Sequence, residues 1–253
     1  MGVHGAPLRR CPTKAGHPLA PPKRVGHILG MRRPRLSPLL PAAALATLAA
    51  CGDAPRRPPA AEAPVAPAIP GPSATPLRSP DRYRVAFVTS AGAFTVEVTR
   101  ALAPRAADRF FELVQGGYYA GTRFYRVVPG FVAQWGIHGD TAVHARWRDA
   151  TMPDDPPRTG NVRGTVAFAA SGPDTRATEV FVSTGDHRRA LDRQRFAPFG
   201  TVVAGMDVVD RLNGEYGEEP NYAKIKRQGT AYLQRWFPAL DSVVTARVVP
   251  AGG

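Results

Sequence analysis

The sequence predicts a mainly β domain, in which a closed and mostly antiparallel barrel is covered by two or more helices. Short runs of alternating apolar and polar residues recur between Tyr83 and Val249, and turns rich in glycine and proline separate them. Only a few helical patterns interrupt these runs. Closure is expected because a closed sheet leaves no exposed strand edge.

The domain begins with a predicted hairpin. Residues 83–89 and 94–98 each alternate apolar and polar side chains, and the turn Ser90-Ala91-Gly92-Ala93 separates them. A last strand over residues 242–249 is well placed to pair with the first. Four further short strands are expected in between, at residues 122–128, 164–169, 179–183 and 200–203.

Two helices are predicted from apolar residues at helical spacing. The first begins at Pro104 and ends at Gly116-Gly117, and the second spans residues 206–212. Residues 215–238 are interpreted as a helical elaboration that packs on the barrel rather than as a site. Its apolar residues are Ile225, Tyr232, Leu233, Trp236 and Phe237.

The N-terminal region differs from the domain in composition. Residues 31–51 have the pattern of a secretory signal, with a basic start, an apolar run over 36–50 and small residues before Cys51. The run is shorter than the roughly 20 residues of a membrane-spanning helix. Residues 48–51 resemble the lipobox of bacterial lipoproteins, which implies a lipid on Cys51 and a membrane tether. An ordinary cleaved signal is the alternative, and residues 1–30 are interpreted as an upstream extension or a cytoplasmic tail.

Residues 52–80 are rich in proline and alanine without apolar periodicity, so we expect a disordered, extended linker before a domain at 81–250. Both cysteines, Cys11 and Cys51, precede this domain, which suits an oxidising compartment. Of the net charge of +13, most lies in the leader: up to Pro80 there are 11 Lys/Arg and 2 Asp/Glu, and the remaining 22 and 18 leave only +4. A nucleic-acid-binding function therefore loses its main premise.

Common catalytic and metal-binding motifs are missing from the sequence. It has no nucleophile elbow, phosphate-binding loop, dinucleotide-binding turn or zinc-protease motif. The nearest metal-like group, His138, Asp140 and His144, has a spacing that suits neither one helix face nor a strand, and we interpret it as a solvated loop. No metal and no cofactor are expected.

Four blocks in a fixed order carry a more specific signal. They are residues 124–136 (FYRVVPGFVAQWG), 168–175 (FAASGPDT), 178–182 (TEVFV), and the pair 191–192 (LD) with 196–200 (FAPFG). Together they resemble the cyclophilin family of peptidyl-prolyl isomerases, over about residues 83–249. The resemblance implies a cyclophilin-like β-barrel and isomerisation of X–Pro bonds.

That chemistry needs neither a nucleophile nor a metal. Rotation about the X–Pro bond faces a barrier of about 18–20 kcal/mol, because amide resonance must be broken. A guanidinium aimed at the twisted prolyl nitrogen favours the transition state. The resemblance assigns this catalytic role to Arg126. It implies a substrate-binding set of Phe131, Val132, Gln134, Ala169, Ala170, Glu179, Phe181 and Leu191.

Within this set, Phe131, Val132, Phe181 and Leu191 would form the proline pocket. Gln134 would hold Arg126 or the substrate carbonyl, and Ala169 and Ala170 would run alongside the peptide. The alternatives are that Phe131 and Phe181 belong to the barrel core, and that Arg126 is a surface residue in an ion pair.

The sequence departs from the family at several of these positions. Tyr125 replaces a histidine, which we expect to matter little if the side chain faces away, and Trp135 replaces a small residue. Val132 stands where methionine is common, the tryptophan usual before Leu191 is missing, and the family's pocket histidine cannot be assigned. Glu179 replaces a glutamine. We hypothesise that its carboxylate pairs with Arg126 and lowers activity, the alternative being that it points to solvent.

The expected protein is thus a monomeric, membrane-tethered prolyl isomerase in the cell envelope, facing the periplasm or the exterior. Its substrates would be proline-containing segments of exported proteins. The alternative function is a cyclophilin-like binding or holdase module that grips such segments without turning them over.

Overall fold

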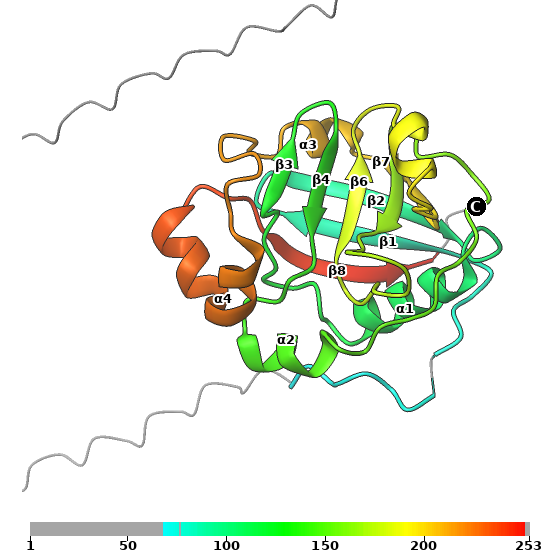
Figure 1. The fold of residues 1–253 in the computed structure, drawn as a ribbon, viewed down its shortest axis with the longest axis horizontal. Helices are drawn as coiled ribbons and strands as arrows, with labels where there is room; N and C mark the ends of the chain where they lie inside the picture. Colours follow the sequence, from blue (N-terminus) through cyan, green and yellow to red (C-terminus); the bar gives the residue numbers. More distant parts are fainter. Residues whose placement is uncertain (1–67, 76, 251–253) are drawn as a thin grey trace, which may run out of the picture. The chain divides into compact units, whose positions relative to one another are not determined.

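The computed structural model describes residues 68–75 and 77–250. The extension, the signal segment, Cys51 and most of the predicted linker lie outside the described residues. Within these residues, eight strands form one sheet: β1 (Arg82–Thr89), β2 (Gly92–Thr99), β3 (Arg126–Val128), β4 (Val132–Trp135), β5 (Thr165–Phe168), β6 (Val180–Ser183), β7 (Gly200–Ala204) and β8 (Val243–Val249). The helices are α1 (Pro104–Gln115), α2 (Thr141–Trp147), α3 (Met206–Asp210) and α4 (Tyr222–Trp236), with a short π-helix, η1 (Arg188–Asp192) (Figure 1).

The sheet is antiparallel throughout and curls on itself. Its strand order is β3-β4-β6-β5-β7-β2-β1-β8, so the predicted pairing of the last strand with the first is confirmed. Its two ends meet through the residues before β3: Arg123 bridges Ser242, and the Val243 N–H donates to the Thr122 carbonyl over 2.9 Å. The predicted fold class is confirmed. The predicted strand 122–128 is divided, because its first half pairs with the start of β8 and its second half with β4.

The first hairpin follows the alternation in the sequence. Thr89 pairs with Gly92 across a two-residue turn, in which the Thr89 hydroxyl donates to the Gly92 carbonyl over 2.7 Å. The buried hydrophobic residues of the two strands are Tyr83, Val85, Phe87, Phe94, Val96 and Val98. These side chains fill one face of the hairpin, which faces the barrel interior.

Trp135, the residue that replaces a small one, fills the middle of the core. It is fully buried, and its ring centroid lies 5.0 Å from that of Phe124 and 5.6 Å from that of Phe87. Helix α1 begins at Pro104 as predicted and packs next to β8.

The predicted solvated loop around residues 138–144 is wrong. Asp140 caps α2, because its carboxylate accepts the backbone N–H groups of Ala142 (2.7 Å) and Val143 (3.3 Å). His138 and His144 are both buried, the second with 2 % of its surface exposed. In the part of the chain that the structure describes, no group of three or more His, Cys, Asp or Glu could hold a metal ion.

The described end of the predicted linker packs on the domain. The Trp147 indole N–H donates to the Pro70 carbonyl over 2.9 Å, and the Ser73 N–H donates to the buried Glu112 carboxylate over 2.7 Å. Ile69 is partly buried against the main core. Ordered chain thus begins before residue 81, because these backbone groups find partners on α1 and α2.

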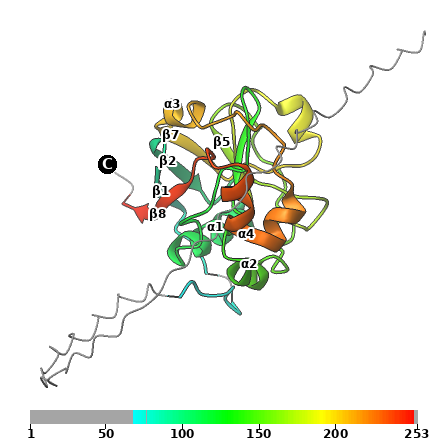
Figure 2. The same ribbon diagram turned by 90° about the vertical axis from the view of Figure 1, so that its left-hand side faces the viewer.

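Helix α4 forms a second small core on the flank of the barrel, next to α2 (Figure 2). Its buried residues Ile225, Tyr232 and Leu233 pack in a cluster with Tyr125 and Ile137. The chain breaks the helix at Gly229 (φ 58°), where the backbone passes close to Gly139. The predicted helix and its packing on the barrel are confirmed, except that Trp236 points outward with 61 % of its surface exposed. The interpretation that this segment is not part of a site is wrong, because Tyr222 and Lys226 line the cavity described below.

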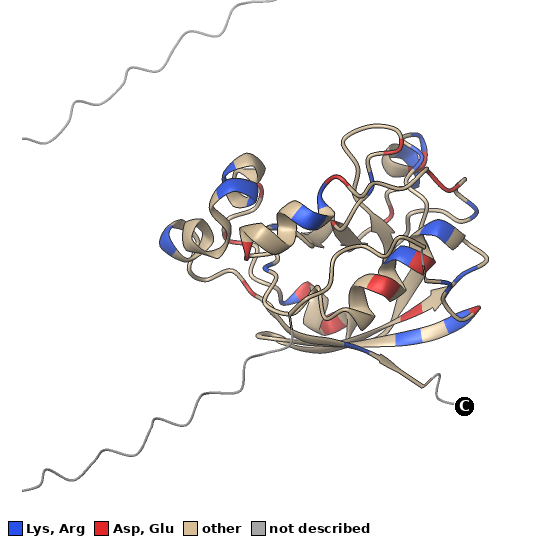
Figure 3. Cartoon of the chain, turned by 90° about the horizontal axis from the view of Figure 1, so that it is seen from below, with Lys and Arg blue, Asp and Glu red and all other residues tan. Residues whose placement is uncertain are grey.

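Acidic and basic positions both occur around the domain (Figure 3), in keeping with its small net charge. Over residues 68–75 and 77–250, no helix combines the length and the apolar character needed to cross a membrane.

Candidate active site

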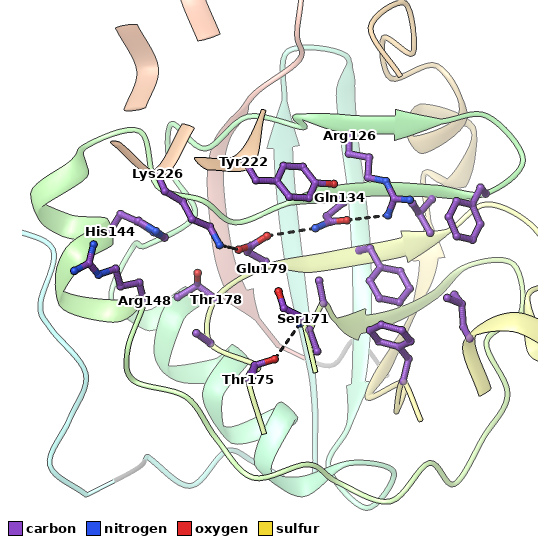
Figure 4. A pocket seen from close by; sticks show the side chains of 18 residues that line it. Arg126, Gln134, His144, Arg148, Ser171, Thr175, Thr178, Glu179, Tyr222 and Lys226 are labelled. Atoms are coloured by element: carbon purple, nitrogen blue, oxygen red, sulfur yellow. Dashed lines mark hydrogen bonds and ion pairs between the residues drawn. The ribbon is translucent and has the colours of Figure 1, made fainter. Parts of the chain in front are cut away.

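A cavity of about 210 Å³ opens beside β3, β4 and β6 (Figure 4). The structure brings together all nine cavity residues predicted from the sequence: Arg126, Phe131, Val132, Gln134, Ala169, Ala170, Glu179, Phe181 and Leu191. Residues separated by as many as 65 positions therefore share one site, as the order of the four blocks indicated. The predicted lipid-bearing residue, Cys51, lies outside the described residues.

Arg126 is the first residue of β3 and lies directly opposite Gln134 of β4. Its Nη1 donates to Gln134 Oε1 over 3.2 Å, and its Nε donates to Glu218 Oε1 over 2.7 Å. Nη2 donates to the same Glu218 oxygen. The guanidinium carbon lies 5.2 Å from the centroid of the Phe131 ring. Arg126 thus lines the cavity and also forms an ion pair, which the sequence analysis had treated as alternatives.

One end of the cavity is an apolar notch, which we define as Phe131, Val132, Phe181, Leu191 and Phe196. These side chains form a cluster separate from the main core, so the assignment of Phe131 and Phe181 to the barrel core is wrong. Alternation along β6 explains the separation, because Val180 and Val182 face the core while Phe181 faces the notch.

Phe196 begins the second part of the fourth block and lies in the notch, although it was not among the residues predicted for the pocket. Its ring lies edge-on to Phe181, with centroids 5.6 Å apart. His187 packs edge-on against Phe131 at 4.8 Å, behind the notch wall.

The hypothesis that Glu179 pairs with Arg126 is wrong, and so is the alternative that it points to solvent. Glu179 Oε1 lies 2.9 Å from Lys226 Nζ, and its side chain is 19 % exposed. Its other oxygen accepts from the Tyr125 hydroxyl over 2.6 Å and from Gln134 Nε2 over 3.4 Å. Helix α4 supplies the cation, and the carboxylate that pairs with Arg126 is Glu218.

Tyr125 has a larger part in the site than the sequence suggested. It faces away from the cavity but is fully buried, and its hydroxyl accepts from Gln134 Nε2 over 3.0 Å. Burial, and next the charge of Glu179, raises the pKa of Tyr125 well above its usual value. The hydroxyl therefore stays protonated and serves as a donor to Glu179.

The other end of the cavity is polar and is built partly by the helices. Its additional residues are His144, Arg148, Ser171, Thr175, Thr178, Tyr222 and Lys226. Burial, and next the charge of Lys226, lowers the pKa of His144, so this imidazole is neutral at pH 7. The residues from α2 and α4 carry no local motif, so single-sequence patterns gave no signal for them.

The loop after β5 forms the floor between the two ends. The Ala169 N–H donates to the Glu179 carbonyl over 2.8 Å, which holds the loop beside β6. The Thr175 hydroxyl oxygen accepts the N–H groups of Ser171 (3.0 Å) and Gly172 (3.1 Å). Ala169 and Ala170 thus line the cavity on a loop that these hydrogen bonds hold in place.

Comparisons with known proteins agree with this geometry. The family model "Cyclophilin type peptidyl-prolyl cis-trans isomerase/CLD" matches residues 84–229, more than half of the chain. The "peptidyl-prolyl cis-trans isomerase-like 1" of Aspergillus oryzae is 34% identical over 141 residues, which is 52% of this chain and 85% of that protein. A peptidyl-prolyl cis-trans isomerase of Acinetobacter baylyi is 32% identical over 150 residues, 55% of this chain and 79% of that protein.

The fold is also similar to that of a solved structure. The crystal structure of a cyclophilin type peptidyl-prolyl cis-trans isomerase of Cryptosporidium parvum matches with a TM-score of 0.52 at 17% identity, over 68% of this chain and 99% of that one. The same protein solved in the presence of the dipeptide Ala-Pro matches with a TM-score of 0.50, over 66% and 98%. At this identity the likeness concerns the fold. With the family model and the relatives, it shows that this chain belongs to the cyclophilin-type family of peptidyl-prolyl cis-trans isomerases and has that activity.

Proposed function

We propose that Arg126 is the catalytic residue of this isomerase and that the apolar notch holds the proline ring of the substrate. The proposal is supported above all by one observation: the Arg126 guanidinium lies over the ring of Phe131, at the edge of the notch. A proline seated in the notch would have its nitrogen within reach of that guanidinium.

The physical reason is differential binding of the twisted amide. In the planar ground state the prolyl nitrogen lone pair is delocalised, and it accepts hydrogen bonds only when the bond is twisted. A donor held at that position therefore stabilises the transition state more than the ground state. Arginine suits the task because it is always charged and its donors form a rigid fork.

The substrate class follows from the notch and the floor of the cavity. Ala169 and Ala170 would run beside an extended peptide, with the proline ring between Phe131 and Phe181. The Cryptosporidium relative was solved in the presence of Ala-Pro, which supports a proline-containing peptide as the ligand of this chain. We further propose that a monomer acts on exported proteins in the cell envelope, tethered through a lipid on Cys51, as the signal and lipobox pattern indicate.

Separate variants test the guanidinium and the notch. Arg126→Ala should abolish most turnover of an Ala-Pro peptide while leaving its dissociation constant within about threefold, since the notch is intact. Phe181→Ala should weaken peptide binding about tenfold, because it removes apolar area from the notch. If Arg126→Ala instead weakens peptide binding and Phe181→Ala instead abolishes turnover, the assigned roles are wrong. Mass spectrometry of the mature chain would test the anchor, which requires a first residue of lipidated Cys51.

A further inference from the structure

We propose that Glu218 and Lys226 are positioning residues for Arg126. Glu218 lies just before α4 and Lys226 lies within it. The two residues are the ends of one row of hydrogen-bonded side chains that crosses the site. The inference rests on the proposed catalytic role of Arg126. It adds to the active site a segment that the sequence analysis had treated as a packed elaboration.

Figure 4 shows the row along the cavity from Lys226 through Glu179 and Gln134 to Arg126; Glu218 continues it beyond the residues drawn. It begins with Lys226 on Glu179 (2.9 Å) and continues from Glu179 to the amide nitrogen of Gln134 (3.4 Å). The amide oxygen of Gln134 then accepts from Arg126 (3.2 Å), and Arg126 donates to Glu218 (2.7 Å). The charges along this row are ordered: a cation and a carboxylate lie at one end, the neutral amide of Gln134 in the middle, and a second cation and carboxylate at the other end. Each charged group therefore lies beside a group of opposite charge or beside the neutral amide.

The charge of Glu179 determines which way Gln134 points. A carboxylate only accepts hydrogen bonds, so the Gln134 NH₂ group must face Glu179 and the Tyr125 oxygen. The amide oxygen is then left to face Arg126. Lys226 holds Glu179 in place through its own contact of 2.9 Å. In this way a cation on α4 orients an amide on β4, and the amide orients the guanidinium on β3.

Glu218 fixes the opposite edge of the guanidinium. Of the five N–H groups of Arg126, Glu218 accepts those on Nε and one on Nη2, and Gln134 accepts one on Nη1. Within the described residues, one N–H on each terminal nitrogen is left without a partner. The guanidinium is thus held on two edges and over the face of Phe131, with donors available for substrate before substrate arrives. Such pre-organisation avoids reorganisation during the reaction.

The segment that carries both residues is itself anchored. Tyr216 packs edge-on against Phe237 at 5.2 Å, and Tyr222 packs edge-on against Tyr125 at 5.3 Å. The side chain of Asn221 caps α4 by accepting the Lys224 N–H over 3.0 Å. Glu218 is 63 % exposed, but it extends from a backbone that aromatic contacts fix on both sides.

The test compares each residue with a matched neighbour. Glu218→Ala is paired with Glu219→Ala, and Lys226→Ala with Lys224→Ala; neither control residue forms an ion pair in the described structure. We expect Glu218→Ala and Lys226→Ala to lower kcat for an Ala-Pro peptide by about threefold to tenfold, with KM within about twofold. The controls should match the wild type. Melting temperatures show whether a variant has lost activity through unfolding.

The dependence of kcat on salt concentration is a second measurement, and it would not differ between wild type and variant if Glu218 had only a structural role. Because the Arg126–Glu218 pair is accessible to solvent, raising the ionic strength screens it. We expect wild-type kcat to fall with added salt and Glu218→Ala to show a smaller fall. An unchanged kcat in a folded Glu218→Ala variant would overturn the inference. So would a raised kcat, which would mean that the carboxylate competes with the substrate.

The outcome is distinguishable from a failure of the proposed function. If Arg126→Ala remains as active as the wild type, the catalytic role of Arg126 is wrong, and the inference fails with it. If Arg126→Ala is inactive while Glu218→Ala and Lys226→Ala equal their controls, the role of Arg126 stands and the inference alone is wrong.

Discussion

Replacing Glu179 by glutamine tests how the site uses its unusual carboxylate. Glutamine is the residue that the family resemblance led us to expect at this position, and the substitution preserves size while removing the charge. The sequence-based hypothesis required activity to rise, because Arg126 would be released. In the structure Glu179 is bound by Lys226, Tyr125 and Gln134 instead, so we expect activity to fall.

The magnitude follows from the contacts that change. A hydrogen bond to a charged group contributes about 1 kcal/mol more than one to a neutral group, which applies to the 2.6 Å contact from buried Tyr125. The half-exposed ion pair with Lys226 adds about 0.5 kcal/mol. The expected loss of stability is about 1.5 kcal/mol, or roughly 3–6 °C in melting temperature for a domain of this size.

The effect on catalysis arises through the neighbouring amide. An amide at residue 179 can donate to Gln134 Oε1, so Gln134 is free to turn away from Arg126. We expect kcat/KM to fall by about threefold, measured with an Ala-Pro peptide in a protease-coupled assay. Glu219→Gln is the control for charge alone. A kcat/KM at or above that of the wild type would show that the carboxylate opposes catalysis, and the account of the row would be wrong.

Two further predictions concern the frame of the site. Gly136 has φ +111°, and a Cβ there would lie 2.4 Å from the Thr178 carbonyl oxygen, so Gly136→Ala should lower the free energy of unfolding by about 3 kcal/mol or prevent folding. Gly121→Ala, at φ +78° with open space, should cost only about 1 kcal/mol in urea denaturation. Burial lowers the pKa of both His138 and His144. The unfolded chain therefore binds protons first as the pH falls below about 6.5, and stability should decrease from pH 7.5 to 5. A double variant with glutamine at both histidines should flatten this slope; an equal slope would contradict the assignment.

The sequence predicted the parts of the fold in which local pattern and burial agree. The first hairpin alternates and helix α1 repeats its apolar residues as their burial requires, while β5 and β6 were predicted as short, largely apolar runs. Strand β4 is buried on both faces like β5 and β6, but it was missed because polar Gln134 interrupts its apolar run, so neither alternation nor a continuous apolar stretch marks it. Helix α2 was missed because its signal is the single cap Asp140, whereas its stability comes from packing of Trp147 and the buried histidines.

The site shows the same difference between residues marked by local sequence pattern and residues placed by tertiary packing. The nine predicted cavity residues were found because they belong to ordered blocks of sequence. Ser171, Thr175 and Phe196 lie in the same blocks and also line the cavity, but they were not assigned to the site. Glu218, Tyr222 and Lys226 were not found, because their positions depend on how α4 packs on Tyr125 and Ile137. The predicted ion-pair partner of Glu179 was wrong for the same reason, because the actual partner, Lys226, lies on α4. Tertiary contacts determine that Arg126 pairs with Glu218. The spacing of residues within a single sequence does not reveal such contacts.

The most direct test of the account is the rate of cis–trans exchange of an Ala-Pro peptide with wild-type and Arg126→Ala protein, measured by exchange NMR at equal peptide saturation. We predict that the wild type accelerates exchange and that Arg126→Ala loses at least about a hundredfold, in line with removal of a positioned donor from a transition state. Rapid exchange in a folded, peptide-bound Arg126→Ala protein would contradict the account, because rotation would then proceed without the guanidinium.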